Sequence, residues 1–149
     1  AAHLARAGGR MSTVLAGAEP GTVLPRITEH LTRDTLVRYA GASTDFNPIH
    51  WSDRAADALG LPGVIAHGML TMGTALRVVT DWCDDPTRVL SYYVRFTKPV
   101  VVPDTDEGAS LDFGGTVTKV ENGVATVSVE ALFNGSKVLG AATSEVRVD

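Results

Sequence analysis

The residues best suited to chemistry lie in one polar stretch, which reads Ser-Thr-Asp-Phe-Asn-Pro-Ile-His over residues 43–50. It brings Asp45, Asn47 and His50 within six positions, and Pro48 restricts the backbone between them. A carboxylate and an imidazole held close together can take a proton from a substrate and return it. Histidine is suited to this because it titrates near neutral pH. The spacing therefore indicates a general acid–base pair of Asp45 and His50.

A second candidate lies at Gly68, within Ala-His-Gly-Met over residues 66–69, where an apolar helical pattern begins. The first backbone N–H groups of a helix have no partner inside the helix and lie at the positive end of its dipole. Glycine at this position lets a ligand approach the backbone closely. We therefore expect the Gly68 N–H to be able to polarise a substrate carbonyl, as oxyanion donors do in enzymes.

Simpler interpretations of the same residues stay open at this point. Asp45 and His50 also suit a structural turn and a position beside a helix. His67 is more typical of a hydrogen-bonded structural histidine than of a catalyst. Asp45, His50 and His67 match no common zinc-ligand spacing, so we expect no metal site. Cys83 is followed by two aspartates, which disfavour a thiolate nucleophile.

Helices are expected to position both segments. Thr32 is a typical N-cap residue, so we expect a helix after it that ends at Gly41. A loop over residues 42–51 and a short helix over residues 53–59 follow. The longest helix is predicted over residues 68–82, and apolar residues occupy most of its circumference. Such a helix must be covered on several sides, which a curled sheet can do and a flat sheet cannot.

The second half of the chain is predicted to form strands. Residues 89–102 are rich in β-branched and aromatic residues. Alternating apolar patterns then predict three further strands, over residues 111–117, 127–133 and 138–148. Asn-Gly pairs at residues 122–123 and 134–135 are typical of tight hairpin turns. The sequence therefore predicts an α+β fold in which an antiparallel sheet wraps a long central helix.

Length and composition exclude several classes of protein. The 149 residues suffice for one domain, which we expect over residues 21–149, after a poorly structured lead-in over residues 1–20. A net charge of −4 argues against binding of nucleic acid. The sequence holds no apolar run long enough to span a membrane. Its single cysteine excludes an internal disulfide and favours a cytoplasmic location.

The polar stretch from Tyr39 to His50, together with Ile-Ala-His-Gly-Met-Leu over residues 65–70, closely resembles the hydratase motif of MaoC-like, (R)-specific enoyl-thioester hydratases. It is most similar to the catalytic subunit of the bacterial (3R)-hydroxyacyl-acyl-carrier-protein dehydratases. Residues 94–100 also resemble the central strand of that family. The resemblance covers residues 20–148 and implies the hot-dog fold, in which a sheet encloses a central helix.

The resemblance implies a role for each residue of the motif. Asp45 and His50 would activate a water molecule and return its proton to the α-carbon of the substrate, or act in reverse. The Gly68 N–H would bind the thioester oxygen, Asn47 would steady the loop, and Met69 would line an acyl tunnel. The implied reaction is reversible hydration of a trans-2-enoyl thioester, carried by CoA or acyl carrier protein, to a (3R)-3-hydroxyacyl thioester. No metal or organic cofactor is implied, and the reaction belongs to fatty-acid or related acyl metabolism.

One position departs from the family pattern. The family usually has glycine directly before the aspartate, where this chain has Thr44. The Cβ atom of threonine narrows the backbone conformations open to the loop. The departure bears on the placement of Asp45, although it removes neither catalytic group.

Two other functions are compatible with the same fold. A non-catalytic sister subunit would only shape the acyl pocket, and it would have no need of both Asp45 and His50. Hot-dog thioesterases carry a carboxylate on or beside the central helix, whereas residues 66–80 contain none. In each case an uncovered sheet face or edge predicts a homodimer, or a heterodimer with a sister hot-dog subunit. We expect the acyl tunnel at or near that interface.

Overall fold

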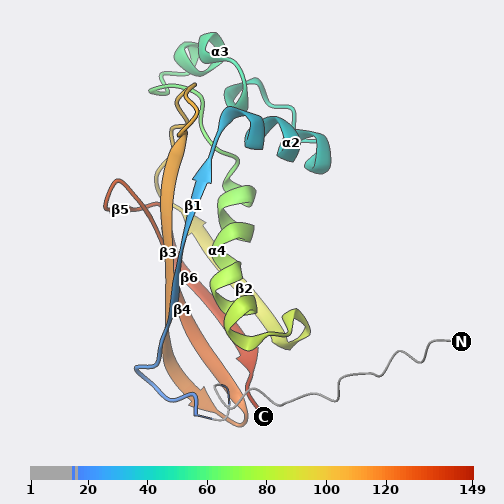
Figure 1. Cartoon of the computed structure of the whole chain (residues 1–149), viewed down its shortest axis with the longest axis vertical. Coiled ribbons are helices and arrows are strands. Elements are labelled where there is room, and N and C mark those ends of the chain that lie inside the picture. The colour runs from blue at the N-terminus through green and yellow to red at the C-terminus, as the bar shows by residue number, and fades with distance from the viewer. Residues whose placement is uncertain (1–14, 16) are drawn as a thin grey trace, which may run out of the picture.

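The computed structural model describes residue 15 and residues 17–149 (Figure 1). The lead-in expected over residues 1–20 therefore lies largely outside the described residues. Of its described part, Leu15 is buried in the hydrophobic core and its carbonyl accepts a hydrogen bond from the Ala18 N–H at 3.0 Å. None of the helices in the described part of the chain has the length and apolar character needed to cross a membrane.

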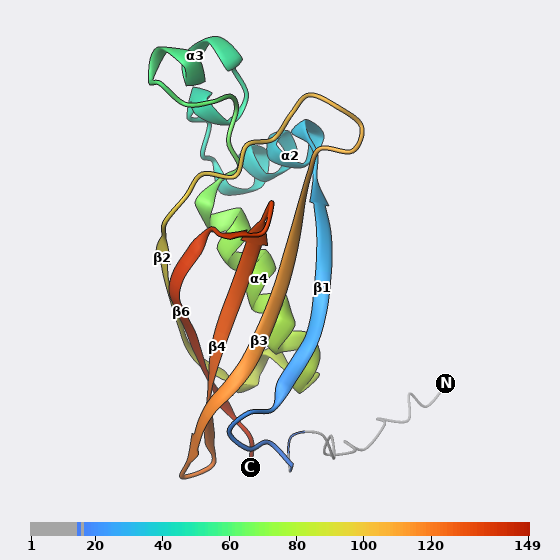
Figure 2. The same ribbon diagram turned by 90° about the vertical axis from the view of Figure 1, so that its left-hand side faces the viewer.

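All strands belong to one antiparallel sheet with the order β1-β3-β4-β6-β2. The strands are β1 (Val23–Leu31), β2 (Val89–Phe96), β3 (Ala109–Glu121), β4 (Val124–Phe133), the two-residue β5 (Ser136–Lys137) beside β4, and β6 (Leu139–Arg147). The sheet curves around α4 (Gly68–Cys83), which contacts all five long strands (Figures 1 and 2). The predicted α+β architecture, an antiparallel sheet around a long central helix, is confirmed.

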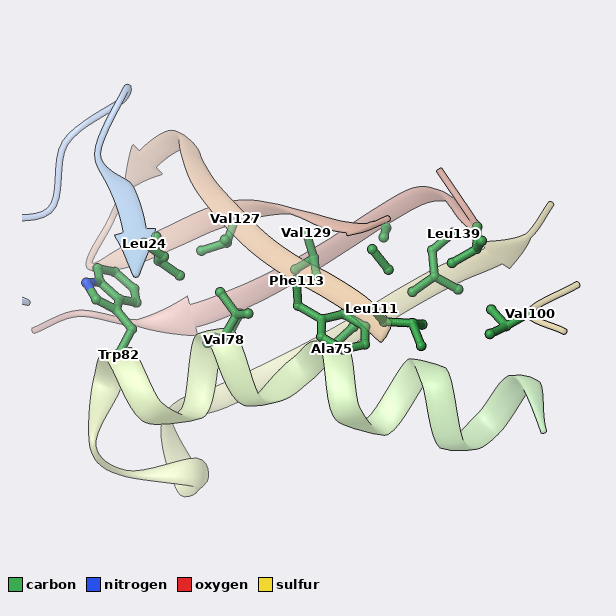
Figure 3. Packing of buried hydrophobic residues seen from close by; sticks show 14 of the residues in the cluster. Leu24, Ala75, Val78, Trp82, Val100, Leu111, Phe113, Val127, Val129 and Leu139 are labelled. Carbon is green, nitrogen blue, oxygen red and sulfur yellow. The ribbon is translucent and has the colours of Figure 1, made fainter. Parts of the chain in front are cut away.

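The core lies between α4 and the concave face of the sheet (Figure 3). Ala75, Val78 and Trp82 recur at helical spacing and present one buried stripe to the strands. Phe113 is fully buried opposite this stripe. Glycine at residue 115 lets the helix come close, since a Cβ atom there would lie 3.3 Å from the Val78 side chain. The long helix is thereby fixed along its length.

The helices before α4 start where the sequence predicts, but the first one ends later. Thr32 caps α2 (Arg33–Ser43), and its hydroxyl accepts a hydrogen bond from the Thr35 N–H. The end predicted at Gly41 is wrong, because glycine weakens a helix by only about 1 kcal/mol and does not by itself stop one. The helix ends instead at Thr44, which has a left-handed conformation with φ 61°.

The loop expected over residues 42–51 is accordingly shorter than predicted and contains a turn of 3₁₀ helix, η1 (Pro48–His50). Ser52 then caps α3 (Asp53–Ala58) as predicted. A second 3₁₀ turn, η2 (Pro86–Arg88), connects α4 to β2.

The observed strands differ from the predicted ones in two places. The strand predicted over residues 89–102 ends at Phe96, because Pro99 has no N–H to donate and the segment pairs elsewhere. Within that segment, the Val102 N–H donates to the Val64 carbonyl at 2.8 Å. The strand β1 was not predicted, because Pro25 and a β-bulge interrupt its apolar alternation. Both predicted hairpin turns are confirmed, with positive φ at each Asn-Gly pair.

Candidate active site

The imidazole of His50 is buried and held by the main chain. Its Nδ1 lies 2.7 Å from the carbonyl oxygen of Ile65, at the start of the segment that leads into α4. A carbonyl can only accept, so Nδ1 carries the proton and Nε2 of the neutral ring presents its lone pair. The Ile65 N–H donates in turn to the Ile49 carbonyl at 3.1 Å. These two bonds fix both the orientation and the tautomer of His50.

Asp45 lies across from the free nitrogen of this ring. Its Oδ2 is 3.9 Å from Nε2 of His50, and its Oδ1 accepts a hydrogen bond from the Asn47 N–H at 3.2 Å. The carboxylate is 51% exposed, whereas the imidazole is 8% exposed. A separation of 3.9 Å is too long for a direct hydrogen bond. It allows one small donor to lie within hydrogen-bond distance of both groups.

The loop between the two side chains is stiffened by its own hydrogen bonds. The Oδ1 atom of Asn47 accepts from the Ile49 N–H at 3.3 Å and caps η1, so this side chain serves the turn. The Ser43 hydroxyl accepts from the Asp45 N–H at 3.3 Å. Thr44 lies between Ser43 and Asp45 in the chain, and its left-handed backbone turns the chain towards Asp45. This is the position at which the family pattern has glycine, the residue that adopts this conformation at least cost.

A pocket of about 410 Å³ opens beside His50, at the end of α4 that lies next to α2 in Figure 1. Its walls are largely apolar and include His50, Gly68, Thr71, Phe96, Lys98 and Leu139. Gly68 is the first residue of α4, and no side chain caps the helix there. A Cβ atom on Gly68 would lie 3.0 Å from the Phe96 ring. Glycine therefore keeps the pocket open where the helix presents its first backbone N–H groups.

The structure thus brings only some of the expected site residues to the pocket. His50 and Gly68 line it. Asp45 is not part of the lining, but its carboxylate lies 3.9 Å from the imidazole of His50, which is. Asn47 faces its own turn. Met69 is 58% exposed and lies outside the pocket lining.

His67 is the third ionisable group of this cluster and lies against the other two. Its side chain is 1% exposed, and burial lowers the pKa of its imidazole below the usual value. Its ring stacks on that of His50 with centroids 3.8 Å apart and planes inclined by 24°. Among the described residues, the carboxylate of Asp45 and the two imidazoles offer ligand atoms within 4.8 Å of one another.

The ring geometry does not suit a shared metal ion. Zinc lies about 2.0–2.1 Å from each histidine nitrogen, in the plane of its ring. The nearly parallel, stacked planes of His50 and His67 do not meet within such a distance. Each ring also has one nitrogen within hydrogen-bond distance of a main-chain carbonyl. The cluster is therefore better suited to proton transfer than to ligation.

Sequence reasoning missed the parts of the site that depend on tertiary structure. The Ile65 carbonyl that holds His50 leaves no signature in a side-chain pattern. Phe96 reaches the pocket because the chain leaves the sheet directly after it, at the break that was not predicted. Leu139 comes from β6, far along the chain.

The chain matches the family described as MaoC like domain over residues 16–132. It is 41% identical over 81 residues to the 3-hydroxyacyl-thioester dehydratase X of Mycobacterium tuberculosis. This match covers 54% of this chain and 28% of the relative. A solved structure of a MaoC-like dehydratase superposes with a TM-score of 0.85 at 41% identity, over 89% of this chain and 41% of that one. This chain spans less than half the length of both proteins.

A further solved structure is similar over nearly its whole length. It is a chain of the ChsH1-ChsH2 complex from Mycobacterium tuberculosis, with a TM-score of 0.75 and 27% identity. The match covers 87% of this chain and 97% of that chain.

Replacing Thr44 by glycine is expected to raise the free energy of unfolding. A left-handed backbone costs a residue with a Cβ atom about 1–2 kcal/mol, and the greater freedom of glycine in the unfolded chain offsets about 0.5–1 kcal/mol of that gain. The net gain of about 0.5–1 kcal/mol is measurable by urea denaturation followed by circular dichroism. Thr118→Gly is the control, an exposed threonine inside β3 that is not left-handed, and it should lower stability. Equal losses in the two variants would contradict strain at Thr44.

Proposed function

This chain belongs to the MaoC-like domain family of hot-dog hydratases and dehydratases, and we propose that it hydrates trans-2-enoyl thioesters reversibly to (3R)-3-hydroxyacyl thioesters. One observation carries the proposal. His50 and Gly68 line the same pocket, and Asp45 lies 3.9 Å from the free nitrogen of His50. An acid–base pair and a backbone oxyanion donor are the groups that addition of water to an enoyl thioester requires.

In the hydration direction, Nε2 of His50 and the Asp45 carboxylate accept hydrogen bonds from a water molecule. The water oxygen forms a bond to the β-carbon while one of its protons passes to the pair. The electrons of the carbon–carbon double bond move towards the thioester oxygen, and the Gly68 N–H stabilises the charge that develops there. The same proton then passes to the α-carbon, which completes the product. Dehydration follows these steps in reverse.

The shape and lining of the pocket support a thioester substrate. Its apolar walls suit the first carbons of an acyl chain, and Lys98 on its rim suits an anionic carrier group. CoA and acyl carrier protein present the same pantetheine arm, so both belong to the proposed substrate class. No step of the proposed reaction uses a metal or an organic cofactor.

A second hot-dog subunit, identical or related, is proposed to complete the tunnel. Strand β2 lies at one end of the described sheet and exposes three large hydrophobic residues, Leu90, Tyr93 and Phe96. An edge strand has unpaired backbone groups, and with exposed hydrophobic side chains it is suited to contact with a second subunit. Met69 is exposed on the adjoining helix, and we assign it to a tunnel wall that the second subunit would close. The structural similarity to a chain of the ChsH1-ChsH2 complex supports this arrangement. We also place the protein in the cytoplasm, where the single, buried cysteine, Cys83, would stay reduced.

The two alternative functions fit the site less well. Hot-dog thioesterases carry a carboxylate on or beside the central helix, whereas residues 66–80 contain none and the acidic residue of α4, Asp81, lies near the far end of the helix, 3.9 Å from the guanidinium of Arg77. A subunit that only shapes the pocket has no use for an imidazole and a carboxylate brought together as in this chain. Hydration remains the reaction that uses all three groups.

Asp45→Asn and His50→Ala are each expected to lower the rate of hydration by about 10²–10⁴-fold, the usual contribution of general acid–base catalysis. The assay follows the loss of the enoyl absorbance of crotonyl-CoA, or of a longer enoyl-CoA. Unchanged circular dichroism and thermal unfolding show that each variant is folded. Wild-type rates in both variants would contradict the assignment of the pair.

The same assay separates the alternatives. Release of free thiol from acyl-CoA without loss of the enoyl group identifies a thioesterase. Activity that appears only with a sister subunit and survives both substitutions identifies a subunit that shapes the pocket.

A second test concerns the oxyanion position and has a matched control on the same helix. Gly68→Ala is expected to lower the hydration rate at least tenfold, because its methyl group would press against the Phe96 ring, 3.0 Å away, and displace the N–H. Gly73→Ala adds the same methyl group at an exposed position of α4, where nothing apart from the adjacent residues and the helix's own backbone lies within 4 Å. It should leave the rate unchanged and raise stability by about 0.5–1 kcal/mol. Equal rates in the two variants would argue against a role for the Gly68 N–H.

A further inference from the structure

His67 occupies an unusual position for a polar residue. It is the N-cap of α4, yet its side chain makes no capping hydrogen bond, and it is 1% exposed. It does not line the pocket, so no direct contact with substrate explains it. Two contacts of its ring reach the Asp45–His50 pair.

The first contact holds the backbone of Asp45. Nε2 of His67 lies 3.1 Å from the carbonyl oxygen of Asp45, and because a carbonyl only accepts, Nε2 carries the proton. Nδ1 of the same ring is buried and has no hydrogen-bond partner among the described residues. Protonation of Nδ1 would bury a donor without an acceptor, which is costly. The geometry therefore keeps His67 neutral and in one tautomer.

The second contact holds the ring of His50. The two imidazoles are stacked, with centroids 3.8 Å apart, and Tyr39 packs at a tilt against His67 with its centroid at 4.8 Å. The Ile65 carbonyl fixes His50 within the plane of its ring, and His67 supports one face of that ring. Rotation of His50 out of this position would require His67 to move as well.

We propose that neutral His67 is a positioning residue, which sets the distance between the Asp45 carboxylate and Nε2 of His50. It does so by bonding the main chain of one partner and stacking on the ring of the other. The left-handed turn at Thr44 lies directly before Asp45, so without this bond the carboxylate can swing away from the imidazole. Misplacement by about 1 Å can cost a reaction 10²-fold. The inference rests on the proposed hydratase function.

Three substitutions separate the two contacts. His67→Gln keeps an N–H near the position of Nε2 but removes the stacked ring, whereas His67→Phe keeps a ring and removes the donor. We expect each to lower kcat about tenfold, and His67→Ala to lower it about 10²-fold, with KM changed less than twofold in all three. The control is His30→Ala, an exposed histidine on β1, which should keep wild-type kcat and KM. If His67→Ala does not fold, the Gln and Phe variants decide the question.

A merely structural role would have a different outcome. It would lower stability and leave the kcat of the folded fraction intact, or raise KM. As a further readout, His67→Gln combined with Asp45→Asn should lose little more than Asp45→Asn alone, because His67 acts through the pair. If the wild-type protein is active and kcat is unchanged in both the Gln and the Phe variant, the inference about His67 is wrong while the proposed function stands. Inactive wild-type protein, alone and with a sister subunit, overturns the proposed function and the inference with it.

Discussion

The hydrogen bond between Nδ1 of His50 and the Ile65 carbonyl joins the two segments that carry the candidate site. The segment that contains Ile65 is bonded on its other side as well, since the Ala66 N–H donates to the Val100 carbonyl at 2.8 Å. The loop that carries Asp45 and His50, the segment that leads into α4, and the pocket wall at Val100 are therefore joined by hydrogen bonds. Because the bond also fixes which nitrogen of His50 is free, it determines what the imidazole can do.

The fold supplies the rigid frame for this unit. The helix α4 is clamped along the concave face of the sheet by its buried stripe, so the position of Gly68 follows from core packing (Figure 3). The loop that carries Asp45 has no such burial, and its carboxylate is half exposed. It is held by local hydrogen bonds and by the ring of His67. The proposed oxyanion donor is thus firmly fixed, whereas the position of the Asp45 carboxylate depends on a few polar contacts.

Features encoded by neighbouring residues could be predicted from the sequence. The Thr32 cap, both Asn-Gly hairpins and the start of α4 at Gly68 depend on local rules, and the sheet around α4 follows from the apolar circumference of that helix. The proximity of Asp45 and His50 follows from a separation of five positions. The stacking of His67, the Ile65 carbonyl and the pocket wall at Leu139 could not be predicted, because they depend on tertiary contacts or on main-chain atoms. Strand β1 was missed because its bulge hides the period of two.

The central proposal is that Asp45 and His50 act as one catalytic unit. The turnover of the variant that lacks both side chains tests this most directly. Residues that act as a unit show strongly non-additive losses. Asp45→Asn combined with His50→Ala should therefore have a kcat for enoyl-CoA hydration close to that of the weaker single variant. A double variant whose loss is the product of the two single losses would show that the two side chains act independently, and would contradict the shared site.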